Sequence, residues 1–226
     1  MFEKAFESQR LVNEAAAGLL GELEARGIAV ASLDDVRLDG DNVEVLAPLL
    51  LAHVFSARYP PFVQALIDKV SVPQAANFAI PQLAFFIRRV PADYRDPIEA
   101  ESGREGDPTW QERIRDYIGS ALGQLVAPDW ADIFLELASD RGLGGSRFEI
   151  IHNLSKSRDE RVPEVLLALL NDPSVAVFAA EALGEMRWPQ ARAALARLAL
   201  TGDLPAKRAA ASALRRISVR KRPDSG

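Results

Sequence analysis

Cysteine is absent from the 226 residues of this chain, which excludes several classes of protein at once. Disulfide-stapled scaffolds, zinc or iron–sulfur centres ligated by cysteine, and thiol catalysis all require that side chain. Histidine is scarce too, because the chain has His53 and His152 alone. A histidine metal site usually needs three or more converging ligands. We therefore expect no metal and no other cofactor.

Long apolar runs are also missing. The longest one reaches from Val45 to Phe55 and is interrupted by Pro48 and His53, whereas a helix that crosses a bilayer needs about 20 apolar residues. The first residues are acidic and do not have the pattern of a secretory signal. The sequence therefore predicts a soluble, cytoplasmic protein without membrane contact.

The charge of the chain is unevenly distributed, although its composition is that of an ordinary folded protein. Residues 1–186 carry 17 Lys and Arg against 30 Asp and Glu, whereas residues 187–226 carry 10 against 2. The basic end has two interpretations. One is a surface for an acidic partner or nucleic acid. The other is a solvated helix face followed by a solubilising tail, or a segment that docks against the protein's own acidic part, and this second interpretation is the commoner origin of such charge.

Apolar residues recur at helical spacing throughout the chain, most clearly from Arg161 to Ile217. The turn at Asn171–Ser174 interrupts this pattern, because Pro173 disfavours helical backbone at the residue before it. Pro189 and the segment Thr201–Pro205 interrupt it again. The sequence therefore predicts four short helices in this stretch.

These helices belong to a repeat, which is marked by leucines spaced 29 to 32 residues apart at positions Leu122, Leu154, Leu183 and Leu214. Each unit consists of two helices and a turn. Weaker units precede them at 48–70 and from Pro81 onward, and the acidic segment 90–107 enlarges the loop of the latter.

The repeats predict three segments. Residues 1–45 form an N-terminal cap, with a helix that ends at Gly27 and an extended stretch or short strand over 28–42. Residues 46–217 form the repeats. Residues 218–226 form a basic polar tail.

The stretch from Leu169 to Met186, with its Asn-Asp-Pro turn and the run Ala-Ala-Glu-Ala-Leu-Gly, resembles HEAT-like repeats of the short bacterial type, also called phycobilin-lyase-type HEAT repeats. The segment from Asp203 to Leu214 is similar to the same pattern. The resemblance covers Trp130–Ile217 best, extends less clearly over 81–125, and is poor over 1–45. It implies an all-α fold, a right-handed α-solenoid of about five helix pairs with a helical cap. It implies little about function, because one fold hosts many activities.

The HEAT-like family tends to place a basic residue early in the second helix of each unit. In this chain Arg115, Arg147, Lys207 and Arg208 fit that position, whereas Ala176 and Val177 depart from it. Such side chains could pair with turn aspartates across repeats, as an internal ladder, or could line a basic groove for an anionic partner. The ladder is the simpler interpretation, because it needs no ligand.

HEAT-like enzymes have recognisable residue patterns in their sequences. The HEAT-like iron-dependent hydroxylase uses repeated His-Glu dipeptides, whereas here Val54 and Asn153 follow the histidines. HEAT-like DNA alkylation-repair glycosylases use a basic concave surface with tryptophans and an aspartate. This chain has Trp110, Trp130 and Trp188, but residues 1–186 are net negative, which opposes binding to a phosphate backbone. A bilin lyase is suggested by family analogy alone.

Other catalytic patterns are weak. The glycine-rich stretch Gly142–Arg147 could hold an anion, but it lacks the Lys-Ser/Thr of a P-loop and is better read as a turn. The paired carboxylates Asp34 with Asp35, and Asp93 with Asp96, fall in predicted loops, where solvation is the simpler expectation.

We therefore expect a non-enzymatic module that binds a protein partner along the concave face of the solenoid. The alternative is a HEAT-like DNA-binding or DNA alkylation-repair glycosylase-like protein. A large apolar side chain exposed on such a face would mark a contact surface, so Phe178 is either exposed there or packed under a neighbouring helix. Helix phase and the basic positions that the resemblance implies together give these groove candidates: Arg115, Arg147, His152, Phe178, Glu181, Glu185, Lys207, Arg208 and Arg215.

Overall fold

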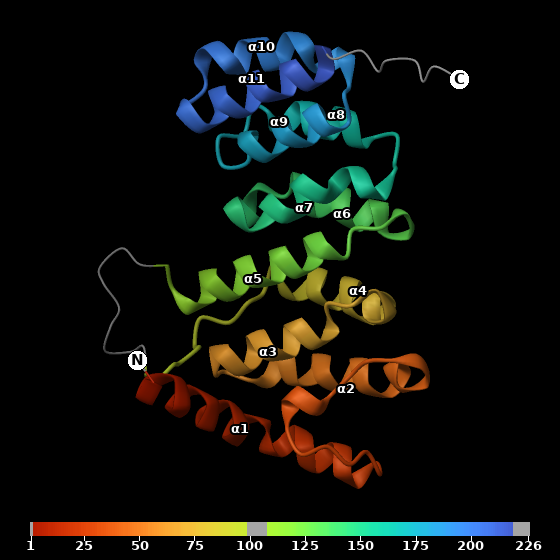
Figure 1. The fold of residues 1–226 in the computed structure, drawn as a ribbon, viewed down its shortest axis with the longest axis vertical. Coiled ribbons are helices and arrows are strands. Elements are labelled where there is room, and N and C mark those ends of the chain that lie inside the picture. The colour runs from red at the N-terminus through yellow and green to blue at the C-terminus, as the bar shows by residue number, and fades with distance from the viewer. Residues whose placement is uncertain (1, 99–107, 219–226) are drawn as a thin grey trace. The chain divides into compact units, whose positions relative to one another are not determined.

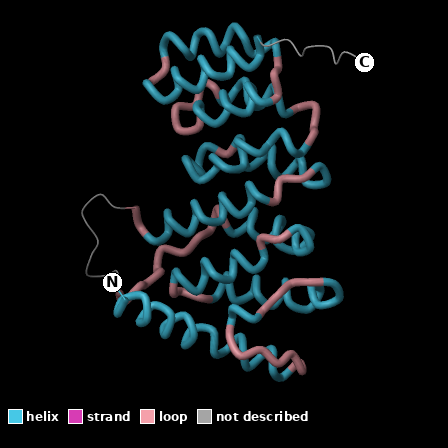
Figure 2. Tube along the Cα trace, viewed as in Figure 1, coloured by secondary structure: helices cyan, strands magenta, loops and turns pink. Residues whose placement is uncertain are grey.

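The computed structural model describes residues 2–98 and 108–218. Over these ranges all regular structure is helical, with α-helices joined by turns and short 3-10 helices and with no strand (Figure 2). The expected all-α class is confirmed. The chain divides into two compact units, residues 1–125 and 126–226. This boundary falls inside the segment 46–217 that the sequence assigns to the repeats.

The first unit contains five α-helices among its described residues. They are α1 (Phe2–Ala25), α2 (Val43–Ser56), α3 (Pro60–Val70), α4 (Ala76–Phe86) and α5 (Trp110–Gln124). Helix α2 packs against α3 and α4, and α5 packs against α3 and α4. The core is aliphatic and includes Leu50, Leu66 and Leu83, which are fully buried.

Helix α1 ends as its sequence indicates. Gly27 has a φ of 77°, a left-handed conformation that favours glycine. The amides of Gly27 and Ile28 donate to the carbonyls of Glu24 and Leu23, which closes the helix with the double hydrogen bond typical of a glycine C-terminus. The following stretch, 28–42, contains no strand and instead has two 3-10 turns, Leu33–Asp35 and Gly40–Asn42. Buried Leu33 and Val36 anchor it.

Helix α4 begins at Ala76, five residues before the predicted start at Pro81. Proline inside a helix removes one backbone hydrogen bond, so its position suggested a helix start. The apolar side chains Ala79, Ile80 and Leu83 are buried around it. Their burial outweighs the lost hydrogen bond, so the helix continues through the proline.

The loop between α4 and α5 was expected to be acidic and solvated. In its described part Asp93 is exposed and pairs with Arg58 at 2.9 Å. Asp96, however, is buried and accepts a hydrogen bond of 2.8 Å from the Ile98 amide. The expectation that both carboxylates are solvated is therefore wrong for Asp96. The remainder of the loop, 99–107, lies outside the described residues.

The second unit is a series of helix pairs, seen at α6–α7, α8–α9 and α10–α11 in Figure 1. Helix α9 packs against α7, α8 and α11, and α10 packs against α11. The four helices predicted between Arg161 and Ile217 are confirmed. The helices of this unit are α6 (Ala131–Ser139), α7 (Phe148–Asn153), α8 (Val162–Leu169), α9 (Ala176–Glu185), α10 (Arg192–Thr201) and α11 (Leu204–Ser218).

Small residues let α9 and α11 approach closely. A Cβ atom added at Gly184 would lie 2.7 Å from the Cα and 2.8 Å from the Cβ of Ala213. The repeat leucines Leu154 and Leu183 are fully buried, whereas Leu214 is half-buried. Leu214 belongs to the last helix pair among the described residues, so no later pair covers it there.

Candidate functional site

Most of the groove candidates lie on the second helices of the pairs in the second unit, which are α7, α9 and α11. Helix α9 lies between the other two and contacts both. Its side chains Phe178, Glu181 and Glu185 share one side of the helix, because positions separated by three or four residues align. We define the second-helix face by these three residues together with the side chains that they contact, Phe148, His152 and Arg216.

An aromatic pair occupies part of this face. The rings of Phe148 and Phe178 have centroids 5.2 Å apart and are tilted by 40°. This geometry lies within the range of favourable aromatic contacts. Both side chains are half-buried. Phe178 therefore lies between the two outcomes that the sequence allowed, since it packs on a neighbouring helix and also reaches the surface.

Two polar pairs, one of them an Arg–Glu ion pair, flank the aromatic pair. His152 Nδ1 lies 3.7 Å from Glu181 Oε2, and their side chains are 37% and 40% exposed. Glu185 Oε1 accepts a hydrogen bond of 3.3 Å from Arg216 Nη1. These pairs join residues 29 and 31 positions apart, the same spacing as the sequence repeat. The face therefore combines two carboxylates, Glu181 and Glu185, with the guanidinium of Arg216 and the imidazole of His152.

Arg147 does not lie on this surface. Its side chain is fully buried, and its Nη2 donates to Asp172 Oδ2 at 2.6 Å. Its Nη1 donates to the carbonyl of Ala138, and its Nε to that of Gly144. Arg147 therefore acts as the internal ladder that the sequence allowed, a cross-repeat contact with a turn aspartate, and it is not exposed in a groove.

The environment of Asp172 explains its ionisation. Burial raises the pKa of this carboxyl, but hydrogen bonds from Arg147 and Ser174 outweigh burial and lower the pKa to about 2. Its Oδ1 accepts from the amide and hydroxyl of Ser174 rather than from the first turn of α9. At the equivalent turn Asp203 does cap the next helix, because its Oδ1 accepts the Ala206 amide at 2.8 Å.

The remaining basic candidates are not among the residues that define the second-helix face. Arg115 belongs to α5 in the first unit, where its Nε is buried without a hydrogen-bond partner among the described residues. On α11, Lys207 is half-buried, and Arg208 and Arg215 are exposed. Neither Lys207 nor Arg208 forms an ion pair with a turn aspartate within the described ranges, so the ladder is found at Arg147 and not at these two positions.

Two residues of the second-helix face escaped sequence reasoning. Phe148 precedes Phe178 by 30 residues, and Arg216 follows Glu185 by 31. A search for matching side chains at the repeat spacing would have identified both. The sequence instead selected Arg215, the neighbour of Arg216.

The tryptophans occupy helix boundaries. Trp110 is the first residue of α5, Trp130 directly precedes α6, and Trp188 follows α9. All three are half-buried. The Arg113 guanidinium lies 4.8 Å from the centroid of the Trp110 ring. The glycine-rich stretch is a 3-10 segment, Arg141–Arg147, that Asp140 caps through the Gly142 amide.

Within the described ranges 2–98 and 108–218, no group of three or more His, Asp or Glu side chains is arranged to hold a metal ion. None of the helices described there combines the length and apolarity needed to cross a membrane. No family model, curated protein or solved structure matches the chain.

Proposed function

We propose that this chain is a HEAT-like repeat protein of the cytoplasm that binds a protein partner and has no enzymatic activity. Its repeats would form a right-handed α-solenoid, with the second helices on the concave side. Support comes from contacts that repeat at the period of the sequence. Phe148–Phe178, His152–Glu181 and Glu185–Arg216 each join corresponding helices 29 to 31 residues apart.

The aromatic pair is the observation that carries the binding function. Aromatic side chains are enriched in protein interfaces, because they bury a large area at a small cost in conformational entropy. Phe148 and Phe178 are half-buried beside each other, with polar groups on neighbouring turns. We infer that an apolar side chain of an extended partner segment packs on these rings, while His152, Glu181 and Glu185 contact its polar groups.

The charges of the second-helix face favour a protein partner over a nucleic-acid partner. A groove that binds a phosphate backbone needs several cations without local counterions. On the second-helix face, Arg216 faces Glu185 and His152 faces Glu181. Arg147, which would have extended a basic strip, is buried against Asp172.

The proposal is tested with Phe178→Ser and the control Phe85→Ser. Phe85 is 58% exposed and belongs to the first unit. Wild type and the two variants are each used to capture proteins from the native host. A protein that wild type and Phe85→Ser capture, but Phe178→Ser does not, is then purified. Calorimetry measures the Kd of its binding to each form of the chain. We expect Phe178→Ser to weaken binding at least about tenfold, as for an interface aromatic.

Two results would contradict the proposal. One is a purified partner that binds wild type and Phe178→Ser with equal Kd. The other is salt-sensitive binding to duplex DNA that Phe178→Ser leaves intact and Arg215→Gln weakens, which would favour the nucleic-acid alternative. Circular dichroism melting of each variant separates a loss of binding from a loss of fold.

A further inference from the structure

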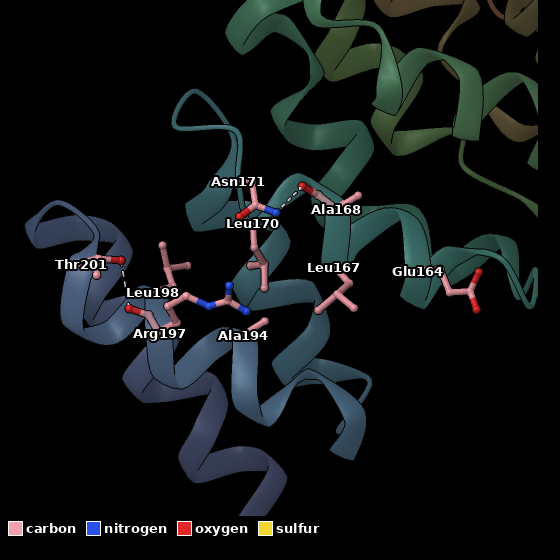
Figure 3. A pocket seen from close by; sticks show the side chains of 9 residues that line it. All are labelled: Glu164, Leu167, Ala168, Leu170, Asn171, Ala194, Arg197, Leu198 and Thr201. Carbon is pink, nitrogen blue, oxygen red and sulfur yellow. Dashed lines mark hydrogen bonds between the residues drawn. The ribbon is translucent and has the colours of Figure 1, made fainter.

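A hollow of about 420 Å³ lies between α8 and α10, the first helices of the last two described pairs (Figure 3). Its apolar wall includes Leu167, Leu170, Ala194 and Leu198. A second hollow, of about 340 Å³, shares Leu170 and Leu198 with it. These volumes are in the range of small-ligand sites. We call the first of them the α8–α10 hollow; it involves none of the residues that define the second-helix face.

A cation extends across this hollow. In Figure 3 the Arg197 side chain passes Leu198, and its guanidinium reaches toward Leu167 and Ala194. The guanidinium forms no hydrogen bond or ion pair with any described residue, although the Arg197 carbonyl accepts the Thr201 hydroxyl at 3.0 Å. Two arginines of this unit, Arg147 and Arg161, are instead paired with the carboxylates of Asp172 and Asp132.

Three other polar side chains line the hollow, those of Thr201, Asn171 and Glu164. Asn171 donates its Nδ2 to the Ala168 carbonyl at 3.4 Å, and its Oδ1 accepts no hydrogen bond from the described residues. Glu164 also lines the hollow, and Figure 3 shows its carboxylate directed away from Arg197. A ligand with many negative charges would be repelled by Glu164. A single carboxylate attached to an apolar group complements Arg197 and the leucines.

We propose that the α8–α10 hollow binds the carboxyl terminus of a peptide whose last residue is aliphatic. The α-carboxylate pairs with the Arg197 guanidinium, whose planar fork suits two parallel hydrogen bonds. The last side chain packs on Leu167, Leu170 and Leu198. A peptide terminus fits better than a separate acidic side chain, because its carboxylate and aliphatic group share one Cα atom and are therefore close together. Asn171 Oδ1 accepts a peptide amide.

The proposal is independent of the function inferred for the second-helix face, since it concerns different helices and a different ligand. The test uses the full chain and an N-acetylated tetrapeptide that ends in leucine, as the free acid and as the amide. Methyl NMR of Leu167 and Leu198 reports occupancy up to millimolar peptide. We expect the acid to bind about tenfold more tightly than the amide, with shifts in both leucine methyl groups.

Variants separate a specific site from general charge attraction. Arg197→Gln is expected to abolish the preference for the acid. Arg208→Gln, which removes an equally positive and exposed side chain of α11, is expected to preserve it. The proposal is overturned if acid and amide bind equally, if neither shifts the leucine methyl groups, or if the two variants weaken binding to the same extent. An amidated peptide with an internal aspartate that binds as tightly as the acid would also overturn it.

Discussion

Asp172 is a buried carboxylate that is held by a buried cation. It lies in the turn between α8 and α9 and pairs with Arg147, a fully buried cation from the preceding helix pair. Burying either charge alone would cost several kcal/mol, whereas burying both with good hydrogen bonds costs far less. The pair therefore joins two consecutive helix pairs, and removing either partner would leave the other charge buried at a large cost in folding free energy.

Replacing Arg147 with alanine should lower the free energy of unfolding by about 3 to 5 kcal/mol, because Asp172 would remain buried without its main counterion. Arg141→Ala is the control, since Arg141 lies 3.8 Å from the same carboxylate but is 76% exposed. Urea unfolding followed by circular dichroism measures both variants. Equal stability of the two would show that the buried pair contributes nothing specific.

The pair also predicts a dependence on pH. Folding lowers the pKa of Asp172 from an ordinary value near 4 to about 2, so this carboxylate stabilises the fold above pH 4. That contribution should fall progressively as the pH drops from about 4 to 2. Asp172→Asn should flatten this part of the stability curve relative to wild type, measured by denaturant unfolding at each pH. An unchanged slope would rule out the lowered pKa.

Gly184 provides a steric prediction at the same scale. Gly184→Ala should destabilise the chain by about 1 to 3 kcal/mol, because the new Cβ would overlap the backbone of Ala213 on α11. Gly21→Ala is the matched control within α1, where an added Cβ meets no atom within 4 Å and should stabilise the helix by roughly 0.5 to 1 kcal/mol. Thermal melting compares the two variants, and we expect Gly184→Ala to lower the melting temperature and Gly21→Ala to raise it.

At the scale of one element, α11 depends on the turn before it. Asp203→Ala should cost about 1 kcal/mol of stability, because the Ala206 amide loses its hydrogen-bond acceptor at the start of the helix. Glu24→Ala removes a carboxylate from the exposed end of α1 and serves as a control with little expected effect. Differential scanning calorimetry tests this, and a null result at Asp203 would assign the amide to another acceptor.

At the scale of the whole molecule, the division into two units predicts local unfolding. Leu166 is fully buried in the second unit, so Leu166→Ala should cost about 2 to 5 kcal/mol there. Hydrogen exchange of amides in 126–218 should accelerate, while the slow amides of α2 and α3 keep their rates. The reciprocal variant Leu50→Ala should affect the first unit alone. Uniform acceleration in both units would indicate one cooperative unit.

Much of this architecture could be predicted because its causes are local. Proline at position 173, glycine at position 27 and aspartate at position 203 interrupt, end or cap helices through their own backbone and side-chain chemistry. Helical spacing and the leucine period depend on the order of residues alone. These signals therefore predict the elements, their class and their repeat without knowledge of any distant contact.

Other features depend on partners that are distant in sequence. Arg147 and Lys207 share the same position in the repeat pattern, yet Arg147 is buried because Asp172, 25 residues later, reaches it. Phe178 is half-buried because Phe148 packs on it, and Asp96 is buried in a loop that composition suggested was solvated. Burial and pairing follow from how helices pack, and packing sums many weak contacts between segments. The sequence pattern alone could therefore place these side chains on a helix or in a turn, but could not assign their surroundings.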